Sequence, residues 1–145
     1  MNIVAQAERI ARKAHAGQVD KQGVDYILHP ERVAAAVETD EQKAIAWLHD
    51  VLEDTPVSFY HLVATERMPI AVASSVWMLS RKSSEDYTEF IDRIAKKGNV
   101  NEITVKLADL KDNLRPGGSP TLYERYKVAI ALLEQTLYDL NGART

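Results

Sequence analysis

Apolar residues recur every three or four positions along most of this chain, the spacing of a buried helix face. In the first segment this spacing predicts a helix that ends near Gly17. The apolar positions of that helix are Ile3, Ala7, Ile10, Ala11 and Ala14. Residues 17–29 lack the pattern, so we expect a loop there.

Two helices are expected in the next segment. Pro30 suits the first position of a helix, which we expect over residues 30–37. Thr39 and Gln42 have the spacing of a capping box and predict the start of a third helix. The core stripe of this third helix is Ala44, Trp47, Leu48 and Val51.

The rest of the chain also predicts helices. Thr55 and Pro56 should end the third helix and begin a fourth over 56–66. Further helices are expected after Pro69, after residues 83–84 as far as Gly98, over 102–114, and after the breaker cluster at 117–120. No segment alternates as a strand does. We therefore predict an all-α fold of about seven to eight helices, in a single domain that spans residues 1–145.

Composition narrows the class of protein. The chain has 145 residues, of which 46% are hydrophobic and 27% charged, and it contains no cysteine. It shows neither an apolar run of about 20 residues nor the N-terminal pattern of a signal peptide. The net charge of −3 argues against a nucleic-acid polymer as partner. We expect a cytoplasmic protein that binds neither membranes nor nucleic acids; the sequence says nothing of its oligomeric state.

The segment with the most chemical information is residues 49–54, His-Asp-Val-Leu-Glu-Asp. His49 and Asp50 offer adjacent nitrogen and oxygen ligands for one divalent metal ion. Glu53 and Asp54 follow four positions after these ligands and so lie on the same helix face. Four ionisable groups in an otherwise apolar segment are costly unless they serve a site. The segment predicts a metal-dependent hydrolase centre.

Two distant residues complete the expected ligand set. His29 precedes Pro30, and Asp109 lies in an apolar helical stretch where an unpaired carboxylate would be expensive to bury. With His49 and Asp50 they give two imidazoles and two carboxylates. Such a mixed set suits manganese, iron, cobalt, nickel or zinc rather than calcium.

These motifs resemble those of the HD-domain superfamily. The matching stretches are Ala14-His15-Ala16-Gly17-Gln18, Lys21, Gly23, Tyr26-Ile27 with His29-Pro30, His49-Asp50 with Glu53-Asp54-Thr55, and Lys106-Leu107-Ala108-Asp109 with Asn113. Within the superfamily the chain is most similar to the hydrolase domain of RelA/SpoT proteins and to the small alarmone hydrolases. The similarity runs from about Val4 to the last helix.

The resemblance implies an activity and a role for each residue. The activity is removal of the 3′-pyrophosphate from guanosine tetra- or pentaphosphate, (p)ppGpp, with manganese as cofactor. The family's metal ligands correspond to His29, His49, Asp50 and Asp109. Glu53 and Asp54 correspond to the residues that position the attacking water. Lys21 and Asn113 correspond to nucleotide contacts.

The first loop departs from the family pattern. The family has an Arg-Lys pair and a Pro-Tyr pair where this chain has Asp20-Lys21 and Asp25-Tyr26. The family's arginine helps to hold the guanine base. An aspartate cannot stack as a guanidinium does, but it accepts hydrogen bonds from a base edge. The resemblance therefore supports the metal centre more strongly than it supports the identity of the substrate.

Other interpretations stay open. The same metal chemistry serves a phosphohydrolase of another nucleotide or phosphorylated metabolite. A non-catalytic nucleotide-sensing module is less favoured, because the ligand set is complete. Lys21 alone is equally typical of a solvated loop, and Asn113 of a helix C-cap.

Overall fold

The computed structural model describes residues 2–117 and 119–142. Its helices, in chain order, are α1 (Ile3–Ala14), α2 (Leu28–Ala35), α3 (Asp40–Leu48), α4 (Val51–Asp54), the π-helix η1 (His61–Thr65), α5 (Ile70–Met78), α6 (Tyr87–Lys97), α7 (Val100–Asp112) and α8 (Pro120–Gly142). No strand is formed within these residues; the loop after α1 carries one isolated antiparallel bridge between Val19 and Asp25. The expected all-α class is confirmed.

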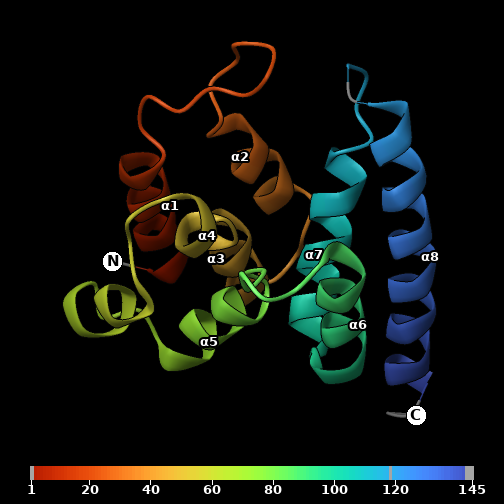
Figure 1. Ribbon diagram of the computed structural model, residues 1–145. Coiled ribbons are helices and arrows are strands. Elements are labelled where there is room, and N and C mark those ends of the chain that lie inside the picture. The colour runs from red at the N-terminus through yellow and green to blue at the C-terminus, as the bar shows by residue number, and fades with distance from the viewer. Residues whose placement is uncertain (1, 118, 143–145) are drawn as a thin grey trace.

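Helix α3 lies at the centre of the fold and contacts α1, α2, α5 and α7. Its residues 44–48 are all buried, so it contributes apolar side chains on every side. Helix α7 packs against α3 on one side and against α8 on the other, and α8 runs along the outside of the molecule (Figure 1). This arrangement brings the start of α2, the end of α3 and the last turn of α7 together.

Among the helix starts that the structure describes, three have a capping box, which fixes where each helix begins. The predicted box at Thr39 and Gln42 is confirmed. Asn99 and Glu102 form the box at the start of α7. The third box, formed by Asp86 and Glu89, starts α6, and Gly98 ends that helix as expected.

Three boundary predictions were wrong. Helix α2 begins at Leu28, so His29 lies within it and Pro30 occupies its third position. The expected helix over 56–66 is reduced to η1. Thr55 is extended ahead of Pro56, as pre-proline residues prefer, and its hydroxyl accepts the N–H of Val57. These local bonds replace the first turn of the expected helix.

The third wrong boundary is the end of the third helix, which was expected at Thr55 and Pro56. Helix α3 ends at Leu48, and His49 and Asp50 form a turn before the short helix α4.

Within the described ranges, none of the helices combines the length and the apolar character needed to cross a bilayer.

Candidate metal centre

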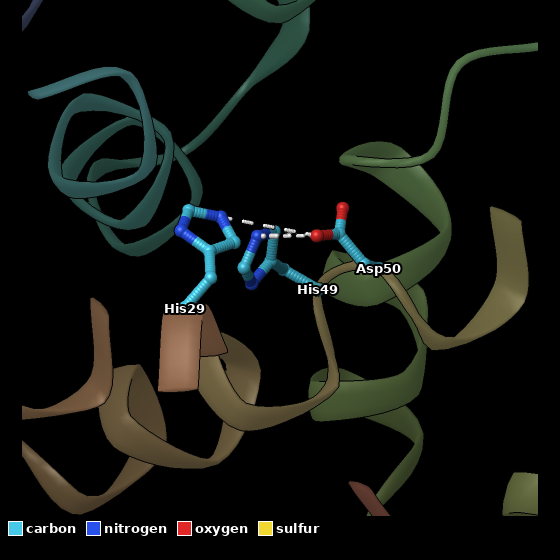
Figure 2. A group of neighbouring side chains, drawn as sticks. All are labelled: His29, His49 and Asp50. Atoms are coloured by element: carbon cyan, nitrogen blue, oxygen red, sulfur yellow. Dashed lines mark ion pairs between the residues drawn. The ribbon is translucent and has the colours of Figure 1, made fainter. Parts of the chain in front are cut away.

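Three segments supply the donor atoms of a compact cluster. His29 comes from the first turn of α2, and His49 and Asp50 come from the turn between α3 and α4. One donor atom from each of these three residues lies within 4.8 Å of the others. Figure 2 shows both imidazole rings facing the Asp50 carboxylate.

Asp109 of α7 closes the cluster from the other side. Its Oδ1 lies 2.8 Å from His29 Nε2 and 3.5 Å from His49 Nε2. The fold therefore brings the four predicted ligands, which span 80 positions from His29 to Asp109, to one place.

The hydrogen bonding of the two ring nitrogens of His49 tests whether these donors fit a metal ion. Its Nδ1 lies 2.6 Å from the Ala46 carbonyl oxygen, so this nitrogen carries the proton. Its Nε2 is buried and forms no hydrogen bond, although it lies 3.1 Å from Asp50 Oδ2. A buried imidazole nitrogen without a partner, aimed at two carboxylates, suits a divalent metal ion. The donor set fits the group that the sequence predicted.

A second layer of polar residues orients the donors. Asp112 Oδ2 lies 2.6 Å from His29 Nδ1, and both Asp112 oxygens also accept hydrogen bonds from Arg32. Tyr26 donates its hydroxyl to Asp50, and Lys106 donates to Asp109 at 2.8 Å. Carboxylates that hold the far nitrogen of a metal-binding histidine are a common feature of metal sites.

Sequence reasoning missed Asp112 and Arg32. Asp112 lies three residues after Asp109, and Arg32 three residues after His29, so helical spacing placed each beside a predicted ligand. Nothing in the sequence showed that the two side chains meet.

The pKa values show how strongly these groups interact. Burial opposes protonation of His29, but hydrogen bonds to Asp109 and Asp112 outweigh it and raise the pKa of His29 to about 9. Burial likewise opposes ionisation of Asp50, yet the neighbouring His49 lowers the pKa of Asp50 to about 2. Despite burial, Lys106 and His49 keep the pKa of Asp109 well below its ordinary value. The carboxylates are thus ionised, which is the form that binds a metal.

The two predicted catalytic acids lie on α4, beside the cluster. Burial first, and then the charge of Asp50, raise the pKa values of both Glu53 and Asp54. Glu53 lines the adjoining cavity, and its Oε1 lies 3.9 Å from Nε of Arg81. Asp54 is not among the residues that line this cavity, and its backbone carbonyl accepts a hydrogen bond from Gln18.

The cavity has a volume of about 530 Å³, which is the size of a small-molecule site. His29, Asp50 and Asp109 lie in its wall, and His49 is buried behind them. Both predicted substrate contacts, Lys21 and Asn113, also line it. The loop after α1 and the turn before α8 form its rim, and aromatic walls come from Tyr87, Phe90 and Tyr126.

The chain was compared with known proteins. A scan against family models finds no match. The chain is 32% identical over 142 residues to the bifunctional (p)ppGpp synthase/hydrolase SpoT of Escherichia coli K12, covering 89% of this chain and 20% of SpoT. It is 33% identical over 140 residues to a guanosine-3′,5′-bis(diphosphate) 3′-pyrophosphohydrolase of Haemophilus influenzae, covering 86% of this chain and 20% of that protein. The chain thus spans about a fifth of the length of these curated relatives.

A solved structure matches nearly the whole chain. It is a metazoan ortholog of SpoT that hydrolyses ppGpp, with a TM-score of 0.72 and 25% identity, covering 99% of this chain and 96% of that one. The shared helical fold, the converging His and Asp donors and these relatives agree with one another. The chain is therefore similar, over nearly its whole length, to this SpoT ortholog and to the part of SpoT that it matches.

Proposed function

We propose that this protein is a metal-dependent phosphohydrolase that releases pyrophosphate from the 3′ position of (p)ppGpp and uses Mn²⁺. The observation that carries the proposal is a four-residue donor cluster in the wall of a nucleotide-sized cavity, with Glu53 beside it. The names of the relatives in E. coli and H. influenzae, and of the metazoan structure, support the substrate.

His29, His49, Asp50 and Asp109 would hold the metal. The chemistry that a divalent ion would supply there is a lowered pKa of bound water and polarisation of a phosphoryl oxygen. Asp112 fixes the orientation of His29 through Nδ1, and the Ala46 carbonyl does the same for His49. The protein thus supplies ligand atoms that are held in fixed orientations.

Glu53 and Asp54 would orient the attacking water and transfer protons. Burial and the charge of Asp50 raise the pKa values of both carboxyl groups, a direction that favours proton transfer by these groups. Because attack on phosphorus expels a ribose 3′-oxygen, one of the two would protonate that oxygen. Arg81, at 3.9 Å from Glu53, supplies positive charge beside this pair.

Lys21 and Asn113 would bind the substrate away from the reacting phosphorus. Both line the cavity, and within the described residues the Lys21 ammonium forms no ion pair. Asn113 ends α7 as its C-cap, so the same residue serves the helix and faces the cavity.

A second candidate keeps the metal chemistry but changes the substrate to another nucleotide or phosphorylated metabolite. The observation that favours it is Asp20, which lines the cavity where the family resemblance places an arginine.

The test is a substrate panel with Mn²⁺ present: ppGpp, nucleoside triphosphates, nucleoside monophosphates and NADPH. We expect pyrophosphate and GDP from ppGpp. Hydrolysis of another member without release of pyrophosphate from ppGpp would support the second candidate instead. In parallel, metal analysis should find about one transition metal per chain, and none in His49→Ala or Asp109→Ala. Full metal content in both variants would contradict the ligand assignment.

A further inference from the structure

The short helix α4 carries both predicted catalytic acids, yet it is too short to be stable alone. It is a single turn, Val51–Asp54, and helices of that length depend on tertiary contacts. Val51 is fully buried and anchors the start of α4 in the core. The position of Glu53 and Asp54 relative to the metal donors therefore depends on what holds the other end of the helix.

A side chain from the loop after α1 holds that end. The Nε2 of Gln18 donates to the backbone carbonyl of Asp54 at 3.0 Å. Carbonyl groups in the last turn of a helix lack partners within the helix, and this bond satisfies one of them. Gln18 and Asp54 are 36 positions apart, so the bond joins α4 to a segment that is distant in the sequence.

Gln18 is held in turn by His15, the residue that follows α1. His15 Nδ1 lies 2.9 Å from Gln18 Oε1. Because the amide nitrogen of Gln18 donates to Asp54, its oxygen is the acceptor, and the proton lies on His15 Nδ1. The backbone N–H of Gln18 also donates to the His15 carbonyl at 3.0 Å, in a turn that Gly17 allows with a φ of +82°. The Gln18 side chain therefore has one orientation.

His15 is a costly residue at a buried position. Only 2% of it is exposed, and its Nε2 forms no hydrogen bond with any described residue. A buried polar atom without a partner is destabilising, so an apolar side chain would pack there at lower cost. An apolar ring would also keep the contact with the Tyr26 ring, whose centroid lies 5.0 Å away. The property that only the imidazole supplies is the Nδ1–H donor to Gln18.

We propose that His15 and Gln18 are positioning residues for the hydrolytic reaction, because they fix the C-terminal end of α4 and with it the carboxyl groups of Glu53 and Asp54. Neither side chain belongs to the donor cluster or lines the cavity. They act through the backbone carbonyl of Asp54. This inference rests on the proposed function, which gives Glu53 and Asp54 their roles.

Steady-state kinetics of Gln18→Met test the bond to Asp54. Methionine has a similar length but no amide, so the variant keeps the backbone bonds of Gln18 and loses both side-chain bonds. We expect kcat for ppGpp to fall about 10- to 100-fold, the effect of misplacing a reacting group by about 1 Å, while KM and metal content stay at wild-type values. Gln135→Met, the same exchange at an exposed position of α8, is the control. An unchanged kcat in Gln18→Met, with or without a raised KM, would overturn the proposal.

Two variants of His15 show whether the Nδ1–H causes the effect. His15→Phe keeps a ring beside Tyr26 but cannot donate to Gln18. His15→Asn places an amide N–H where the imidazole has Nδ1. We expect kcat to be about 10-fold higher in His15→Asn than in His15→Phe, the effect of one hydrogen bond. Equal losses in the two variants would refute the role of His15.

Hydrogen–deuterium exchange separates a failure of this inference from a failure of the proposed function. If the wild type releases no pyrophosphate from ppGpp, the proposed function fails, but the amides of residues 51–55 still report whether α4 is held. Their exchange should be faster in Gln18→Met and His15→Phe than in the wild type, and unchanged in Gln135→Met. Exchange at the wild-type rate in Gln18→Met would overturn the proposal whatever the substrate is.

Discussion

At the scale of single residues, the metal donors depend on partners that are not ligands themselves. Asp112 contacts His29 Nδ1 at 2.6 Å and carries a lowered pKa of about 2; burial alone would raise it, but the hydrogen bonds with His29 and Arg32 lower it. An ionised carboxylate at this position keeps the Nε2 of His29 aimed at the cluster.

We therefore predict that Asp112→Ala lowers metal affinity about 10- to 100-fold, the usual effect of losing such a partner. Competition with a fluorescent chelator measures this affinity. Asp139→Ala, far from the cluster on α8, is the control. Wild-type affinity in Asp112→Ala would show that His29 needs no such partner.

A second prediction separates chemistry from metal binding. Glu53→Gln and Asp54→Asn remove a proton acceptor without removing a member of the donor cluster. Turnover should fall by about two to four orders of magnitude, as general acid–base groups contribute that much, while metal content stays at the wild-type value. Near wild-type turnover in both variants would refute the role of this pair.

At the scale of elements, the connection from α5 to α6 holds one wall of the cavity. Arg93 of α6 donates to the carbonyls of Met78 and Ser80 and forms a two-point pair with Glu85. These bonds, called the Arg93 clamp below, hold the segment that carries Arg81. The Nε of Arg81 lies 3.9 Å from Glu53 Oε1.

The clamp gives a prediction about pH. The hydrogen bond with Arg93 lowers the pKa of Glu85 below its unfolded value, so the folded state binds fewer protons there. The stabilisation is thus present above the ordinary carboxyl pKa of about 4.3 and is lost as the pH falls below it. Glu85→Gln should lower the free energy of unfolding by about 1–2 kcal/mol at pH 7 and by much less near pH 3.

Urea denaturation of the variant and the wild type at both pH values measures this difference. Glu134→Gln, an exposed glutamate on α8, is the control and should have little effect at either pH. A difference between Glu85→Gln and wild type that does not depend on pH would contradict the electrostatic explanation.

At the scale of the whole molecule, the donor cluster connects segments that are distant in the sequence. Helix α2, the turn after α3 and helix α7 each contribute at least one donor. A metal ion bound here stabilises the folded chain in proportion to its affinity, by about 2.7 kcal/mol at 100 times the dissociation constant.

Removal of the metal with a chelator should therefore lower the thermal midpoint of the wild type by several degrees. His49→Ala, which lacks a ligand, should show no response to the same chelator. Differential scanning calorimetry with and without EDTA measures both. Equal responses of the two proteins would mean that the stabilising metal lies elsewhere.

Much of this protein was accessible from sequence alone. Helical spacing gave the all-α class, and Thr39 with Gln42 located the start of α3, because both signals depend on neighbours within one or two turns. The four ligand candidates were found because their residue types are unusual in apolar segments and resemble a known family. Helix boundaries failed at Pro30, because the helix begins two residues earlier at Leu28, and at Pro56, where Thr55 is extended and its hydroxyl accepts the N–H of Val57.

Only the tertiary structure decided which of these residues meet and what surrounds them. His29 and Asp112 are 83 positions apart, and Arg32 and Asp112 are 80 apart. No local rule connects residues so far apart; their contact follows from the packing of α2 against α7. The sequence thus determined which chemical groups the site contains, whereas the fold determined which ones are paired and which remain free for a ligand.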